Sequence, residues 1–187
     1  MQSTKEKYKG RKTQMLYSNK DLKKLIIPLV IEQTLAIAVG MADTIMISVV
    51  GEAAVSGVSL VDTVNILLIN VFSALATGGA VVAGQYLGQK NQKEACKSAT
   101  QLIWFITLCS VVITLLVYAG KYFILHGIFG KIEADVMGHA NTYLMIVTAS
   151  IPFMALYNGG AAIFRAMGNS KVSMQVSIIM NIINVGG

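Results

Sequence analysis

The sequence predicts an all-α fold, a polytopic bundle of membrane-spanning helices, and three observations lead to this prediction. First, the 187 residues are 55% hydrophobic and only 13% charged, which is about half the charge that a soluble domain carries. Second, four apolar stretches are longer than the about 20 residues with which a helix crosses a bilayer. Third, basic residues gather in alternate connections between these stretches.

The apolar stretches place the expected helices in order along the chain. The first helix is predicted over about 25–50, and three further spans over about 57–87, 98–120 and 136–165. At 1.5 Å per residue each of them covers a hydrocarbon layer of about 30 Å. The basic segment 1–21 is followed at once by an apolar run, so we expect it to be a cytoplasmic tail held near anionic lipid.

A fifth apolar stretch, over 172–187, reaches only about 24 Å and is too short to span the membrane. It stays apolar up to the last residue of the sequence. We therefore expect residues 22–187 to be part of a longer transporter, with the last helix truncated.

Charge in the connections predicts the orientation of the chain. When the connections are assigned alternately to two sides, thirteen of the fifteen Lys and Arg residues fall on one side and two on the other. The positive-inside rule places the richer side in the cytoplasm. We therefore expect a multi-pass protein of the cell membrane with a cytoplasmic N-terminus.

Acidic residues inside the predicted spans carry most of the functional information. An acid at the bilayer centre costs about 2.5–3.5 kcal/mol and usually faces a cavity or a partner. The first span contains Glu32 and Asp43, and their spacing of 11 residues places both on one helix face, Glu32 in the inner half and Asp43 in the outer half. The Lys and Arg residues that follow the basic N-terminal segment all lie near helix ends. We therefore expect both acids to lack a fixed cation and to take up a proton or Na⁺. A hydrogen-bonded structural carboxylate is the alternative.

Further polar side chains in the spans are candidates for lining a cavity. Asp62 either shares an outer-half cavity with Asp43 or is solvated at its helix end. The amides of Asn181 and Asn184 either coordinate a cation or bond a neighbouring helix, which is the more frequent role. The candidate substrate or cavity residues are Glu32, Gln33, Asp62, Asn65, Tyr157, Asn158 and Asn184.

The sequence contains no arrangement of residues typical of catalysis. It has no nucleotide-binding loop, no Ser–His–Asp pattern and no CxxC pair. Cys96 and Cys109 lack metal or disulfide spacing and are expected to behave as small hydrophobic residues. We therefore expect no enzyme activity, no cofactor, no nucleic-acid partner and no metal other than Na⁺ at Asp43 as a coupling ion.

Three segments resemble the multidrug and toxic compound extrusion (MATE) family of transporters. EQTLAIAVGMADTIMISVVGEAAVSGVSL resembles the first helix and turn of that family, AGQYLGQKN the end of its second helix, and IPFMALYNGGAAIFRAMGNSK its fourth helix and the following cytoplasmic turn. The resemblance covers about 22–187. It implies a twelve-helix exporter built from two six-helix lobes, of which this chain provides about five helices of the N-terminal lobe.

The resemblance also implies a coupling site. The acid in the family's first helix matches Asp43 and its fifth-helix asparagine matches Asn181, so these two residues are expected to bind the coupling cation. Where some members have a second acid four residues after the asparagine, this chain has Val185. The identity of the ion, Na⁺ or H⁺, is left open.

The expected function is cation-coupled antiport, with Na⁺ or H⁺, that exports organic drugs or toxic compounds across the cytoplasmic membrane, and we expect these compounds to be cationic. The expected partners are a small organic substrate, the lipid bilayer and the C-terminal lobe of the same protein. One alternative is a lipid-linked oligosaccharide flippase of the same superfamily, which should show a more basic cavity, whereas only Arg165 lies in these spans. The other is a non-transporting membrane protein that packs against a partner subunit.

Overall fold

A computed structural model describes residues 19–186, with side chains at all of these positions except 20, 21 and 184–186. Within this range the chain is almost entirely helical and has no strand, which confirms the predicted all-α fold. The elements in chain order are α2 (Asn19–Ser48), α3 (Glu52–Gly88), α4 (Gln92–Phe123), the π-helical turn η1 (Ile124–Ile128), α5 (Ala134–Ala166) and α6 (Ser170–Gly186).

The α-helices begin two to six residues before the apolar stretches that predict them. An apolar stretch marks only the part of a helix that suits hydrocarbon, and the helix continues into polar residues that satisfy its free backbone groups. At the start of α4, for example, the Asn91 side chain accepts a hydrogen bond from the Glu94 backbone N–H at 3.3 Å. At the turn between α2 and α3, Gly51 has a φ of 129°, a conformation that favours glycine.

Four segments are long and apolar enough to cross a membrane: Leu22–Ser48, Glu52–Gly88, Gln92–Ile128 and Ala134–Ala166. Helix α6 is apolar but shorter. Large apolar side chains such as Trp104 and Phe153 are about three-quarters exposed, at 73% and 74%. Such a surface suits lipid rather than water.

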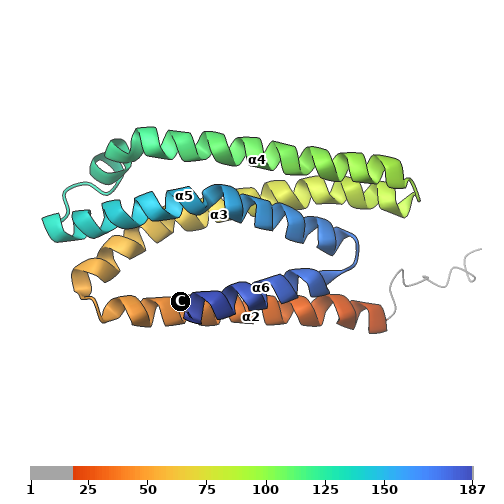
Figure 1. Ribbon diagram of the computed structural model, residues 1–187, viewed down its shortest axis with the longest axis horizontal. Coiled ribbons are helices and arrows are strands. Elements are labelled where there is room, and N and C mark those ends of the chain that lie inside the picture. Colours follow the sequence, from red (N-terminus) through yellow and green to blue (C-terminus); the bar gives the residue numbers. More distant parts are fainter. Residues whose placement is uncertain (1–18, 187) are drawn as a thin grey trace, which may run out of the picture.

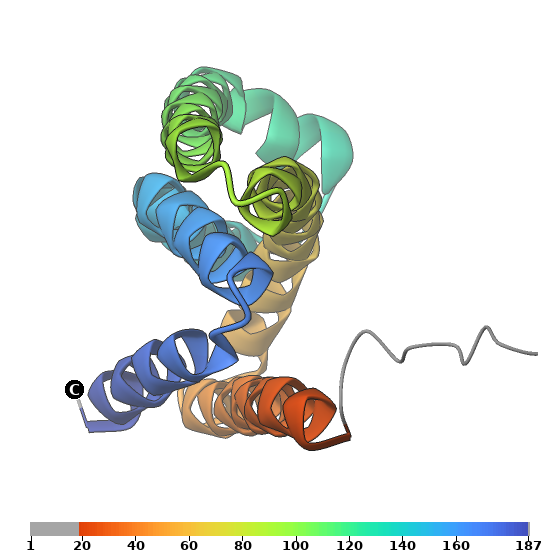
Figure 2. The same ribbon diagram turned by 90° about the vertical axis from the view of Figure 1, so that its right-hand side faces the viewer.

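The helices form two groups. Helices α3, α4 and α5 pack on one another, while α2 packs chiefly against α6 and only lightly against α3. Viewed end-on in Figure 2, the α2–α6 pair (red and dark blue) lies beside the three-helix group. The core of that group contains Phe72, Ile106 and Ile151, each at most 2% exposed.

Small residues let α3 and α5 approach closely. A Cβ atom added at Gly57 would lie 2.8 Å from the Val136 carbonyl oxygen and 2.9 Å from the Ala140 backbone nitrogen. Neither backbone atom can move away without shifting α5. Farther along the same interface, Ala80 and Ala155 are buried in the core, as close packing of membrane helices requires.

The connections alternate between the two ends of the bundle (Figure 1). The start of α2, the α3–α4 connection and the α5–α6 turn lie at one end, and the α2–α3 turn and the segment between η1 and α5 lie at the other. The first end carries Lys90 and Lys171. Its placement in the cytoplasm stays a prediction from the charge count.

Candidate functional site

A cavity of about 600 Å³ lies between the α2–α6 pair and helices α3 and α5. This volume lies within the range of about 300–1,000 Å³ that is typical of small-molecule sites. The walls combine charged groups, amides and hydroxyls with a few apolar side chains. The lining residues are Glu32, Gln33, Ala36, Ile69, Asn70, Ser73, Thr77, Met154, Tyr157, Asn158, Arg165, Ser177, Met180 and Asn181.

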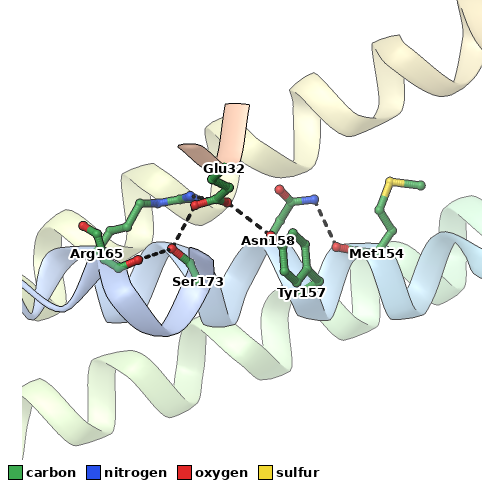
Figure 3. Close-up of polar contacts among 7 residues, drawn as sticks. Glu32, Met154, Tyr157, Asn158, Arg165 and Ser173 are labelled. Atoms are coloured by element: carbon green, nitrogen blue, oxygen red, sulfur yellow. Dashed lines mark hydrogen bonds and ion pairs between the residues drawn. The ribbon is translucent and has the colours of Figure 1, made fainter. Parts of the chain in front are cut away.

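The Glu32 carboxylate is the centre of a polar network that joins three helices (Figure 3). Glu32 belongs to α2 and is only 6% exposed. Its Oε1 accepts a hydrogen bond from the Tyr157 hydroxyl at 3.1 Å, and its Oε2 accepts one from the Ser173 hydroxyl at 2.9 Å. The Arg165 guanidinium donates from Nη1 to Oε1 at 3.4 Å and forms an ion pair with the carboxylate. Donors from α5 and α6 therefore converge on one acid of α2.

Helix α6 contributes to this network through one face of small hydroxyl side chains. Ser170, Ser173 and Ser177 are spaced three and four residues apart, which places them on the same side of a helix. They are 2%, 2% and 8% exposed. Because serine is small, α6 packs close to its neighbours and still presents a hydroxyl to Glu32. The spacing is visible in the sequence, but a search for acids and amides alone does not reveal it.

Arg165 changes the electrostatics of the first acid. The position of the basic residues near helix ends predicts that both acids of α2 lack a fixed cation. Arg165 does lie in the last turn of α5, but its long side chain reaches Glu32, which is 133 residues away in the sequence. The prediction is therefore wrong for Glu32. The two charged residues that line the cavity form a pair of opposite sign.

Asp43 lies in a different environment on the same helix. It is half-buried and does not line the Glu32 cavity. Within the described part of the chain, its carboxylate has neither a hydrogen-bond partner nor an ion-pair partner. Asp62 of α3, in contrast, accepts a hydrogen bond at Oδ1 from the Tyr143 hydroxyl of α5 at 2.9 Å. Asp62, like Asp43, does not line the Glu32 cavity.

The amide candidates divide between these environments. Asn181 lines the cavity together with Glu32, and its Nδ2 is buried without a hydrogen-bond partner among the described side chains. Asn158 also lines the cavity and donates from Nδ2 to the Met154 carbonyl at 3.0 Å. Asn65 lies instead inside the three-helix group beside a small void, and its buried Oδ1 has no partner in the described range. The side chain of Asn184 lies outside the described residues.

The structure therefore collects most of the cavity candidates and adds others. Gln33, Tyr157, Asn158 and Asn181 share the cavity with Glu32, whereas Asp43 lies outside its wall. The sequence did not single out five further residues of the site. They are Asn70 and Thr77 on α3, Arg165 on α5, and Ser173 and Ser177 on α6. Asn70 and Thr77 are seven residues apart and therefore lie on one face of an otherwise apolar helix. This spacing is the feature of the sequence that could have identified them.

Comparison with known proteins places the chain in a family. The sequence model of the MatE family matches residues 28–187. The uncharacterized transporter YisQ of Bacillus subtilis (strain 168) is 33% identical over 160 residues, which cover 86% of this chain and 35% of YisQ. The probable multidrug resistance protein NorM of Thermotoga maritima is 26% identical over 89% of this chain and 35% of its own length.

A solved structure shows the same fold. A MOP superfamily transporter from Pyrococcus furiosus Vc1 superposes with a TM-score of 0.77 and 21% identity, over 87% of this chain and 35% of that chain. The chain thus spans about a third of the length of these relatives. With membrane-length helices, a match over residues 28–187 and 33% identity to a transporter, the chain belongs to the MatE family of multidrug and toxic compound extrusion transporters, multi-pass proteins of the membrane.

Proposed function

We propose that the full-length protein is an antiporter that exports small organic compounds across the cell membrane, driven by inward movement of Na⁺ or H⁺. The single observation that carries this proposal is the cavity of about 600 Å³ between two helix groups. Its amides and hydroxyls orient a solute, and its apolar side chains hold the remainder, as in other small-molecule sites. Family membership supports transport as the general activity.

The two helix groups also suit alternating access. The α2–α6 pair contacts the three-helix group lightly, and the Glu32 network is a polar link between them. A transporter needs two arrangements of comparable free energy that open the site to opposite sides. In our proposal the pair changes its packing against α3 and α5, and the cavity between them changes its access.

Asp43 is the better candidate for the coupling cation. Glu32 already has Arg165 as its counter-charge, so a cation would have to displace a fixed guanidinium. Asp43 has no such partner in the described chain, and an intramembrane acid without one gains most from a proton or Na⁺. Asn181 also lines a second pocket together with Val39 and Ala42, and Ala42 directly precedes Asp43. In our proposal Asn181 assists from the neighbouring helix.

The test uses the full-length protein in proteoliposomes loaded with a fluorescent dye. An imposed Na⁺ or H⁺ gradient should drive dye export by the wild type, and Asp43→Asn should abolish the driven component. Asp135→Asn is the matched control, since Asp135 is exposed in the first turn of α5, and it should export like the wild type. Driven export that survives in Asp43→Asn, or is lost equally in Asp135→Asn, would contradict the assignment.

The flippase alternative finds less support in the cavity. A lipid-linked oligosaccharide carries phosphates, and recognition of several phosphates calls for a net positive wall. Here the single arginine of the wall is matched by Glu32. We therefore favour export of small organic compounds.

A further inference from the structure

We propose that the Glu32 cavity prefers solutes that carry a carboxylate or a similar anionic acceptor beside their positive charge, and that Arg165 is the residue that recognises this group. The preferred substrates are then zwitterionic compounds rather than simple organic cations. This inference rests on the proposed export function and specifies its substrate class.

The Glu32 carboxylate, to begin with, is already occupied. Its two oxygens receive hydrogen bonds from Tyr157 and Ser173 as well as from Arg165, and the side chain is 7% exposed. A cationic solute would have to displace donors from a buried group. The exchange of one set of hydrogen bonds for another yields little net free energy.

The Arg165 guanidinium, in contrast, has N–H groups that make no hydrogen bond within the described structure. Arginine carries five N–H groups, and in the described structure Arg165 directs a single hydrogen bond, from Nη1, to Glu32. The side chain is 27% exposed and lines the cavity. Its free N–H groups suit a carboxylate, which arginine binds with two parallel hydrogen bonds. The buried Nδ2 of Asn181, in the same wall, is a second donor without a partner among the described residues.

The net charge of the wall favours the same class of solute. Glu32 and Arg165 are the charged residues among those that line the cavity, and their charges cancel. A permanent cation therefore brings an uncompensated positive charge close to a guanidinium in a region of low dielectric constant, where an unpaired charge is costly. A zwitterion brings its own counter-charge and places its carboxylate at Arg165. The cavity thus discriminates by repulsion as well as by attraction.

Two dyes of nearly equal shape separate these cases. Rhodamine 110 carries a free carboxylate and is zwitterionic at neutral pH, whereas rhodamine 123 is its methyl ester and a cation. Binding of each dye to the full-length protein in nanodiscs is measured by fluorescence polarisation, at one salt concentration and without any ion gradient. The net free energy of a hydrogen bond to a charged group corresponds to about a tenfold difference in affinity. We therefore predict that the wild type binds rhodamine 110 about tenfold more tightly than rhodamine 123.

Substitutions on the two sides of the pair should move this ratio in opposite directions. Arg165→Gln leaves Glu32 uncompensated and should reverse the preference in favour of rhodamine 123. Glu32→Gln leaves Arg165 uncompensated and should widen the preference for rhodamine 110. The double variant is neutral again and should bring the ratio close to one, and because it removes both charges it serves as the folding control for the single variants.

The outcomes separate this inference from the proposed function. A tighter binding of rhodamine 123 by the wild type, no binding of either dye, or a ratio that neither substitution changes would overturn the inference. Because binding is measured without a gradient, failure to export a bound dye under an imposed Na⁺ or H⁺ gradient counts against the proposed function alone.

Discussion

Removal of one partner of the Glu32–Arg165 pair should destabilise the protein more than removal of any other polar contact in the described bundle. At a separation of 3.4 Å, two unit charges attract by about 5 kcal/mol at an effective dielectric constant of about 20. Desolvation offsets part of this attraction, and the 27% exposure of Arg165 allows further screening. We therefore expect a coupling energy of about 2 kcal/mol between the two side chains.

The measurement is a double-mutant cycle on the full-length protein. The wild type, Glu32→Ala, Arg165→Ala and the double variant are unfolded by increasing fractions of SDS in mixed micelles, and the free energy of unfolding is extracted for each. Each single variant leaves a charge without its partner and should lose about 3 kcal/mol, at the low end for a broken buried pair. The double variant should lose less than the sum, because neither charge is left alone.

The coupling energy of the ion pair can be compared with that of neutral hydrogen bonds. Hydrogen bonds between membrane helices average about 0.6 kcal/mol in such cycles. The Tyr157 and Ser173 contacts to Glu32 should fall near that value when tested by Tyr157→Phe and Ser173→Ala. A coupling between Glu32 and Arg165 of about 0.6 kcal/mol or less would mean that the arginine is no more than another weak donor, and the electrostatic reasoning would be refuted.

Three further predictions concern packing and the hydrogen bond between Tyr143 and Asp62. Gly57→Ala should lower the free energy of unfolding of the full-length protein by more than about 1 kcal/mol, because the added Cβ would lie 2.8 Å from the backbone of α5. Gly78→Ala is the control, since a Cβ there would have nothing within 4 Å. Equal free energies of unfolding in SDS for the two variants would contradict the close approach of α3 and α5. Phe72→Ala should cost about 3–5 kcal/mol in the same assay, because the 1%-exposed ring fills the core, whereas the 74%-exposed Phe153 should tolerate the same change, and similar losses at both would contradict the core assignment. Tyr143→Phe should lose about 0.6 kcal/mol, since it removes one hydrogen bond at 2.9 Å, and a loss of several kcal/mol would show a larger network than the one described.

The helices could be predicted well from the sequence because long apolar runs have one physical solution in a membrane. Backbone groups have no water to bond there, so each run must become a helix. The predicted ends of the helices were less accurate than their number and order, as α4 shows. It begins at Gln92 rather than near 98, because Asn91 caps a polar first turn that hydropathy does not register. The π-helical turn η1 (Ile124–Ile128) has no signal in the apolar pattern at all.

Some members of the site could be predicted from the sequence, but its contacts between helices could not. The presence of an acid inside an apolar span singled out Glu32, and the polarity of Tyr157 and Asn158 inside another span made them candidates; all three line one cavity. This pattern gave no information on contacts between helices distant in the sequence. Arg165 reaches Glu32 across 133 positions, because α6 packs against both α2 and α5 and brings the two side chains within reach. Residues of one helix face therefore differ in chemistry, and among the described residues Asp43 has no ion-pair partner.

In our proposal, Asp43 couples cation movement to solute export. The most direct measurement is the cation flux that a solute evokes: proteoliposomes of the full-length protein receive rhodamine 110 on the side from which it is exported, and movement of Na⁺ tracer or of protons in the opposite direction is recorded. We predict a dye-evoked cation flux in the wild type and in Asp135→Asn, and none in Asp43→Asn. An undiminished dye-evoked flux in Asp43→Asn would contradict the claim.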